Sequence, residues 1–153
     1  MKTEATSTHS LKLSRLIKAP VERVYKAWTE PEQMKQWFGC AETCEVEIEQ
    51  DLRQGGDFRI KMHLSNGDIS EVHGTFKEVL LNERLVFTWT NNFLVFPARD
   101  TLVEVVFLPR GEETEVRLTH TKFATEHSAQ GHTVGWGAAM DKFVGLFEIS
   151  STK

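Results

Sequence analysis

The sequence predicts an α+β domain in which a curved antiparallel sheet of seven strands is wrapped round a long C-terminal helix. Two short helical patterns follow the first strand, a series of segments with a period of two comes next, and a long helical pattern ends the chain. A strongly twisted sheet that closes on one long helix leaves a cleft between them. We therefore expect an apolar cavity between the sheet and that helix.

The first three elements follow from alternation and proline placement. Apolar residues that partly alternate with polar ones predict a strand at residues 11–17. Pro20 then suits the first turn of a helix, and apolar residues recur at helical spacing over 21–28. Pro31 begins a second short helix, which we expect to end at Gly39.

From Thr43 onward the apolar residues alternate with polar ones, as in strands with one buried face. Asn66-Gly67 is a strong hairpin signal, and Gly74 indicates a bulge or bend within a longer strand. The expected strands are centred on 46–48, 58–64, 69–79, 85–90, 102–108 and 116–120.

The C-terminal segment from Glu126 to Thr152 contains no proline and no turn cluster. Its large apolar and aromatic residues recur every three or four positions, which predicts a helix of about 20 residues and ~30 Å. The members of this stripe are His132, Trp136, Met140, Phe143 and Phe147. Glycines within it are costly, so we expect the backbone to approach the sheet or a ligand closely at Gly131, Gly135, Gly137 and Gly145.

Composition limits the possible classes of function. A chain of 153 residues suits one domain, which we expect at 11–152 after a flexible tail at 1–10. The net charge of −4, without a basic cluster, argues against nucleic-acid binding. The sequence has neither a run long enough to span a membrane nor the apolar stretch of a secretory signal. A cytoplasmic monomer or homodimer is expected.

The residues that could carry chemistry do not form known motifs. None of the six histidines belongs to a metal-binding motif, and Cys40 and Cys44 have neither zinc nor redox spacing. We therefore expect no metal, no cofactor and no required disulfide. His120 alternates with buried positions and should point inward as a neutral imidazole.

Two carboxylates in strands, Glu71 and Glu104, have two interpretations. An inward carboxylate beside His120 would favour an enzyme. Salt bridges to Arg59, Arg84 or Arg117 on the outer face are the favoured interpretation. Nucleophile-elbow, phosphate-loop and dinucleotide motifs are absent from the sequence, so we assign no catalytic residue.

Aromatic residues give the strongest functional indication. The chain has four Trp and ten Phe, and many of them are placed to face inward. The apolar loop 91–97 suits a pocket rim or a dimer contact. The expected ligand-binding residues are Trp37, Phe38, Phe58, Ile60, Met62, Trp89, Phe93, Phe96, Phe107, His120, Trp136, Met140 and Phe143.

Several segments, in this order, resemble a known family. They are Ile17–Pro31, Met34–Gly39, Gly55–Arg59, Gly74–Val79, Glu83–Trp89, Thr114–His120 and Gly135–Trp136. The set resembles the START-like superfamily (SRPBCC, Bet v 1-like, with a helix-grip fold). Within that superfamily it resembles the branch of the C-terminal domain of the activator of heat-shock protein 90 ATPase.

This resemblance implies the helix-grip fold but leaves several functions open, since one scaffold hosts many activities. The leading hypothesis is binding of a small hydrophobic or amphipathic molecule in the internal cavity. One alternative is a chaperone-associated interaction domain with a role in the stress response. A second alternative is an enzyme similar to polyketide cyclases or hydrolases.

Overall fold

The computed structural model describes residues 9–38 and 43–151. Its elements are β1 (His9–Ile17), α1 (Val21–Thr29), α2 (Pro31–Met34), β2 (Thr43–Gln50), β3 (Asp57–Leu64), β4 (Ile69–Leu80), β5 (Arg84–Asn91), β6 (Thr101–Arg110), β7 (Glu113–Phe123) and α3 (Glu126–Ser151). The seven strands form one antiparallel sheet. The predicted α+β fold, with two short helices after the first strand, is confirmed.

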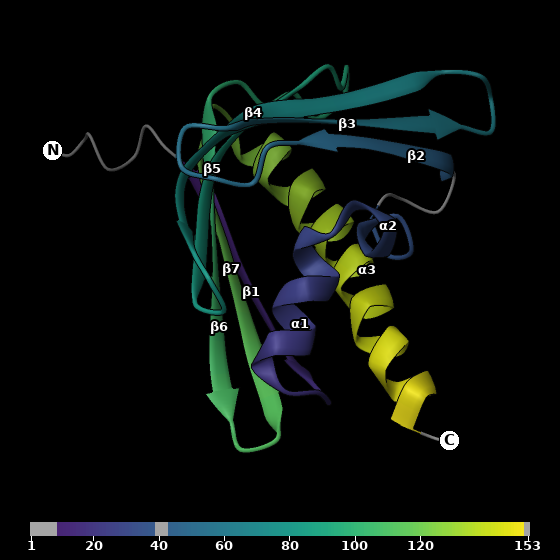
Figure 1. The fold of residues 1–153 in the computed structure, drawn as a ribbon. Helices are drawn as coiled ribbons and strands as arrows, with labels where there is room; N and C mark the ends of the chain where they lie inside the picture. The colour runs from purple at the N-terminus through teal and green to yellow at the C-terminus, as the bar shows by residue number, and fades with distance from the viewer. Residues whose placement is uncertain (1–8, 39–42, 152–153) are drawn as a thin grey trace, which may run out of the picture.

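The strand order is β1-β7-β6-β5-β4-β3-β2, so β1 and β2 lie at opposite edges of the sheet. The chain between these edges is α1 and α2, and they pack on β6, β7 and β2. Figure 1 shows β2, β3 and β4 passing over the top of the molecule while β1, β6 and β7 run down its side. The sheet thus curves round α3, and α1 and α2 lie beside that helix.

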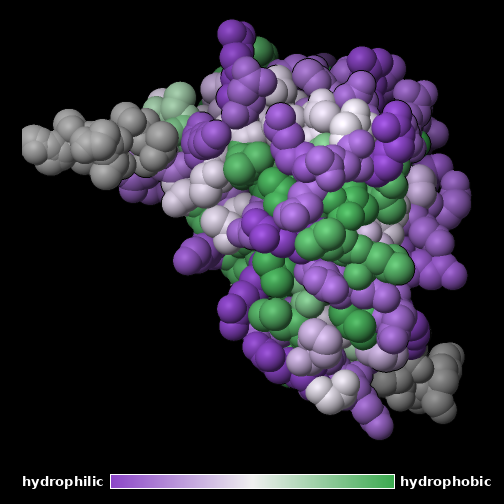
Figure 2. All heavy atoms as spheres, turned by 60° about the vertical axis from the view of Figure 1, so that its left-hand side comes forward, coloured by the Kyte–Doolittle hydropathy of each residue, from purple (hydrophilic) through white to green (hydrophobic). Residues whose placement is uncertain are grey.

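Alternation along the strands separates the core from the outer face. In β6, Val103, Val105 and Phe107 are buried, while the residues between them are half-exposed. This pattern fits the central place of β6 between β5 and β7. The outer surface is of mixed polarity, and Figure 2 shows apolar side chains gathered in the middle of one face among hydrophilic ones.

Helix α3 buries the aromatic stripe that its spacing predicts. His132, Trp136, Met140, Phe143 and Phe147 are all buried against the sheet and the two short helices. Across the described residues, no helix combines the length and the apolar character that crossing a membrane requires.

The prediction for the glycines of α3 is correct only at Gly131. A Cβ atom there would lie 2.2 Å from the ring of Phe96, so the ring rests directly on the helix backbone. Gly135 and Gly145 have nothing within 4 Å of a Cβ, and Gly137 would make an ordinary contact. The expectation of close approach is therefore wrong for these three positions, because Gly135 and Gly145 have open space beside them and Gly137 faces only the end of the Arg15 side chain.

Gly74, where the sequence predicts a bulge or bend, lies close to the backbone of the neighbouring strand. A Cβ atom at this position would lie 1.9 Å from the carbonyl oxygen of Thr88 on the neighbouring strand. The register between β4 and β5 shifts two residues later, between Phe76 and Glu78. Such irregularities bend a strand locally, and β4 is one of the strands that pass over the top of the molecule (Figure 1).

The contrast between two glycines of α3 gives a stability prediction. Gly135→Ala should raise the free energy of unfolding by about 0.5–1 kcal/mol, because alanine favours the helix and meets no neighbour. Gly131→Ala should instead lower it by about 1–3 kcal/mol, because the methyl group displaces the Phe96 ring. Urea denaturation of both variants measures the difference. Equal stabilisation by both would contradict the packing of Phe96 on α3.

Candidate functional site

One small apolar cavity lies between the concave face of the sheet and the three helices. Its volume is about 30 Å³, which corresponds to a single water molecule. The cavity predicted between sheet and helix is present, but in this conformation it is far smaller than a ligand pocket. Its walls are formed by Trp28, Thr29, Met34, Trp37, Phe38, Gln50, Leu52, Phe58, Ile60, Phe76, Leu85, Phe87, Trp89 and Trp136.

A tryptophan-rich cluster forms one side of this cavity and contains all four tryptophans of the chain. The rings of Trp28 and Trp37 have centroids 4.6 Å apart, and those of Trp89 and Trp136 are 5.0 Å apart. Phe38 joins the two pairs, with its ring 5.9 Å from Trp136 and 5.7 Å from Trp37.

A phenylalanine cluster from β3, β4 and β5 forms the other side. The ring centroids of Phe58, Phe76 and Phe87 lie 5.4–5.8 Å apart. Among the residues that the structure describes, no ring contact joins this cluster to the tryptophan-rich cluster. The cavity therefore separates two aromatic groups, each of which is internally packed.

The mouth of the cavity lies at the end of β2. Gln50 and Leu52 are half-exposed, whereas every other lining residue is buried. The side-chain amide of Gln50 donates a hydrogen bond to the backbone carbonyl of Thr29 at the end of α1. This bond joins α1 to β2 beside the mouth.

The indole N–H groups differ in their hydrogen bonding. Trp37 donates to the carbonyl of Ala27 at 3.1 Å, and Trp89 and Trp136 donate to buried imidazoles. Trp28 has no acceptor within the described residues. No fully enclosed side-chain nitrogen or oxygen of those residues lacks a partner, so the Trp28 nitrogen keeps some accessible surface.

His120 lies behind Trp136 and does not line the cavity. The hydroxyl of Thr101 donates to the carbonyl of Trp89 at 2.6 Å, so it accepts from His120 Nε2–H at 2.8 Å. The Trp136 indole donates to His120 Nδ1 at 3.1 Å. Burial lowers the pKa of His120 to about 2, with a further contribution from neighbouring His132. The predicted neutral, inward imidazole is confirmed, but both its nitrogens are already bonded within the protein.

His132 holds α3 to the end of β5 in a similar way. Its Nδ1–H donates to the Ser128 carbonyl at 2.9 Å. Its Nε2 therefore accepts from the Trp89 indole at 3.3 Å and from the Asn91 side-chain amide at 3.1 Å. Burial lowers the pKa of His132, so this imidazole is also neutral.

The structure brings together six of the residues expected to bind a ligand and places the others elsewhere. Trp37, Phe38, Phe58, Ile60, Trp89 and Trp136 line the cavity, whereas Met62, Phe93, Phe96, Phe107, His120, Met140 and Phe143 do not. Two of the latter pack against a wall residue: the ring centroids of Phe107 and Phe143 lie 6.1 and 5.3 Å from that of Trp28. Phe93 and Phe96 cover α3 at His132 and His127, away from the rim.

Sequence reasoning missed other lining residues: Trp28, Thr29, Met34, Gln50, Leu52, Phe76, Leu85 and Phe87. The helical spacing places Trp28 on an apolar helix face, and alternation places Phe76, Leu85 and Phe87 on inward faces. Those signals identify buried residues without showing which of them border a void. The sequence gives no signal for Gln50, a polar residue at a strand end.

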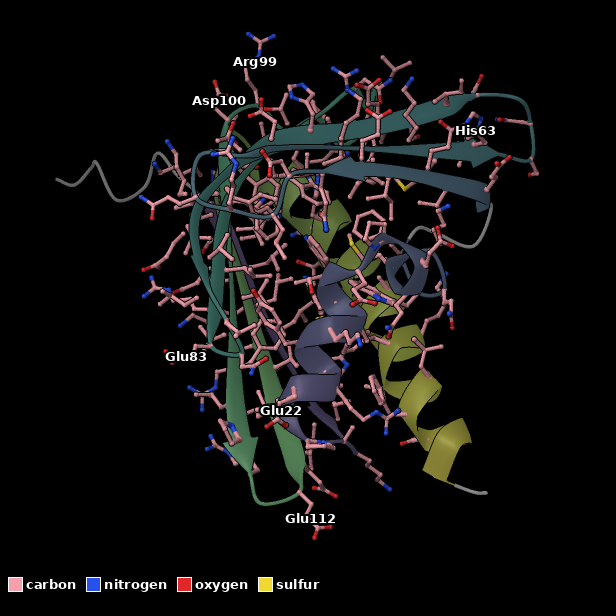
Figure 3. All side chains as sticks on the ribbon, viewed as in Figure 1. Glu22, His63, Glu83, Arg99, Asp100 and Glu112 are labelled. Carbon is pink, nitrogen blue, oxygen red and sulfur yellow. The ribbon has the colours of Figure 1, made fainter. Side chains whose placement is uncertain are left out.

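The carboxylates that could have favoured an enzyme lie outside the core. Glu71 pairs with Arg59 at 3.0 Å and Glu104 with Arg84 at 2.8 Å, which confirms the expected salt bridges. Figure 3 shows charged residues at the periphery, with Arg99 at the top and Glu112 at the lower turn.

Over residues 9–38 and 43–151, no group of three or more His, Cys, Asp or Glu residues could hold a metal ion. The prediction for Cys40 and for the side chain of Cys44 lies outside the described residues.

The buried imidazoles predict a pH dependence of stability. His120 has a pKa of about 2 when folded and 6.5 as its ordinary value, so below pH 6.5 the unfolded chain binds a proton that the folded chain does not. Stability is therefore full above pH 6.5 and falls as the pH decreases. From pH 6.5 to 4.5 His120 alone should account for a loss of about 2 kcal/mol.

Urea denaturation at a series of pH values measures this loss. His120→Gln can still accept from Trp136 and donate to Thr101, but it does not titrate, so its stability should fall less steeply over the same range. His73→Gln removes an exposed imidazole and is the matched control. The same slope in wild type and His120→Gln would contradict the assignment of a neutral His120.

Comparisons with known proteins agree with this fold. The family model described as "Activator of Hsp90 ATPase homolog 1-like protein" matches residues 18–148. A comparison with curated proteins finds no match.

Solved structures with a similar fold come from several bacteria. A protein from Chromobacterium violaceum has a TM-score of 0.81 at 20% identity, covering 91% of this chain and 96% of its own. An AHSA1-like protein from Aeromonas hydrophila has a TM-score of 0.73 at 25% identity, covering 94% and 96%. CalU16 from Micromonospora echinospora has a TM-score of 0.68 at 27% identity, covering 92% and 76%.

The family match spans most of the chain, and the fold and order of elements are those that the resemblance implies. The chain therefore belongs to the activator of Hsp90 ATPase homolog 1-like family, within the START-like superfamily.

Proposed function

We propose that this protein binds a small, largely apolar molecule between the concave face of the sheet and α3. The observation that carries the proposal is the composition of one cavity wall. All four tryptophans and four phenylalanines line the same void, and no charged side chain lines it. Ligand sites are typically lined in this way, by aromatic residues with a few polar groups.

Binding requires the cavity to expand. Its volume of about 30 Å³ is well below the roughly 300–1,000 Å³ of typical ligand sites. The residues at the mouth allow this expansion, because the Gln50 side chain is held to Thr29 by one hydrogen bond and Leu52 is half-exposed. Met34, also in the wall, has a flexible thioether side chain that adapts to new neighbours.

The arrangement of the two aromatic clusters also allows the cavity to expand without disrupting the packing within either cluster. Because the tryptophan-rich and phenylalanine clusters make no ring contact with each other, they can separate without losing their internal packing. A flat apolar molecule placed between them would replace the void with contacts to both clusters. Its differential affinity for the expanded state would then supply the free energy of opening.

The proposal predicts that 2-naphthol binds and quenches tryptophan fluorescence, since all four indoles border the site. Leu85→Phe, which fills the void from β5, should weaken binding at least about tenfold by excluding the probe. Val134→Phe adds the same ring to an exposed position of α3 and is the matched control. Fluorescence titration and calorimetry measure both affinities.

Absence of binding to the wild type at millimolar 2-naphthol would contradict the proposal. Equal loss in the two variants, or no loss in Leu85→Phe when thermal unfolding shows it folded, would place the probe elsewhere.

A second candidate function is contact with a partner protein, and the family description suggests a chaperone. The tip of the loop between β5 and β6 favours it: Leu94 is 96% exposed and Val95 63% exposed. Isolated apolar side chains are common on surfaces, but two adjacent ones at a loop tip suit a contact site.

This candidate predicts that Leu94→Ser combined with Val95→Ser abolishes co-purification with the host's Hsp90 while leaving the affinity for 2-naphthol unchanged. Leu81→Ser, at another exposed apolar residue in a turn, is the control. Retention of the chaperone by the double variant, or no capture by the wild type, would contradict it.

A further inference from the structure

We infer that the ligand is uncharged and that its hydrogen-bonding group is held by Gln50 at the mouth of the cavity. The inference rests on the proposed function and specifies the chemistry of what that site accepts. It follows from the position of the polar groups in the wall, from their unused hydrogen-bonding capacity and from the charges near Gln50.

The polar side chains of the wall lie together at the mouth. Apart from the indoles, Gln50 and Thr29 are the two polar side chains that line the cavity, and they meet through the bond from Gln50 to the Thr29 carbonyl. The Thr29 hydroxyl already donates to the Tyr25 carbonyl at 2.8 Å. A ligand that enters here therefore has its apolar part inside and its polar part beside Gln50.

Gln50 has capacity left for a ligand. A carboxamide offers two N–H donors and an oxygen with two lone pairs. Within the described residues, Gln50 makes one side-chain hydrogen bond, so its oxygen and its second N–H remain available. Trp28, next to Thr29 in the chain, adds an indole N–H that has no acceptor among those residues. The wall can therefore donate to a carbonyl group, or both donate to and accept from a hydroxyl group.

The wall cannot neutralise a charge. No Asp, Glu, Lys, Arg or His side chain lines the cavity, so a buried carboxylate or ammonium group would have no counter-ion. Burying an unpaired charge in apolar surroundings is strongly unfavourable.

The charges near Gln50 add a bias against anions. An open groove of about 620 Å³ shares Gln50 and Phe58 with the cavity wall. Four carboxylates line this groove, and its one guanidinium, that of Arg59, is paired with Glu71. The carboxylates are those of Glu49, Asp51, Asp57 and Asp100. Asp51 is itself paired with Arg53, so the other three carboxylates leave a net negative potential near Gln50 that disfavours an anionic ligand.

Four naphthalene probes of similar size test the inference: naphthalene, 2-naphthol, 2-naphthoate and 2-(aminomethyl)naphthalene, which is a cation at pH 7.5. We expect 2-naphthol to bind at least about tenfold more tightly than either charged probe. Gln50→Leu should weaken 2-naphthol about five- to tenfold by removing a hydrogen bond, and leave naphthalene unchanged. Gln54→Leu, in the exposed turn after β2, is the matched control.

Gln50→Glu provides a second variant that keeps the size of the side chain. Its carboxylate should shift the preference from 2-naphthol toward the cationic probe. Thermal unfolding of each variant establishes that it is folded before titration.

Tighter binding of 2-naphthoate or of the cation to the wild type would overturn the inference, as would equal 2-naphthol affinity in wild type and folded Gln50→Leu. These results differ from failure of the proposed function, in which none of the four probes binds to the wild type.

Discussion

The position of α3 depends on a hydrogen-bonded circuit that begins and ends on that helix. Trp136 of α3 donates to His120 of β7, which donates to Thr101 of β6. Thr101 donates to the carbonyl of Trp89 of β5, and the Trp89 indole N–H donates to His132 of α3. Each imidazole can accept an indole N–H only while it is neutral, and burial keeps both neutral. Three strands and the helix are thereby fixed to one another.

This circuit makes one side of the cavity rigid. Trp89 and Trp136 contribute their rings to the wall while their indole nitrogens are anchored in the core. The opposite side and the mouth have fewer polar anchors, because the phenylalanine cluster is held by packing alone and Gln50 by one bond. Under the proposed function, adaptation to a ligand therefore belongs to the phenylalanine cluster and to the mouth at Gln50.

Much of the fold could be predicted from the sequence because its information is local. Alternation in residues 58–64 and the three- and four-residue spacing of α3 each identify a buried face within one element. The same local signals predict His120 as an inward residue. They do not identify Trp136 and Thr101 as its partners, because those residues come from other elements and meet only after the sheet has curved.

The candidate site was predictable only in part, for a related reason. Periodicity gives the direction of a side chain but not the depth at which it meets its neighbours. Phe107 and Phe58 have the same inward pattern, yet Phe107 packs against Trp28 while Phe58 borders the void. A search for apolar faces does not find Gln50, because it is polar. Its place in the site comes from its hydrogen bond to the Thr29 carbonyl across the mouth.

The pairing of the first strand with the last has a consequence for how the chain folds. Leu11 lies opposite His120, so β1 has no partner until a loop of about a hundred residues has closed. During synthesis the hairpins from β2 to β6 can form while β1 is still unpaired, because its partner is β7. Such long-range pairing slows folding, and an unpaired strand can associate with other chains in the meantime. We therefore expect the last step of folding to join the two ends of the chain, and the indole–imidazole circuit to form together with it.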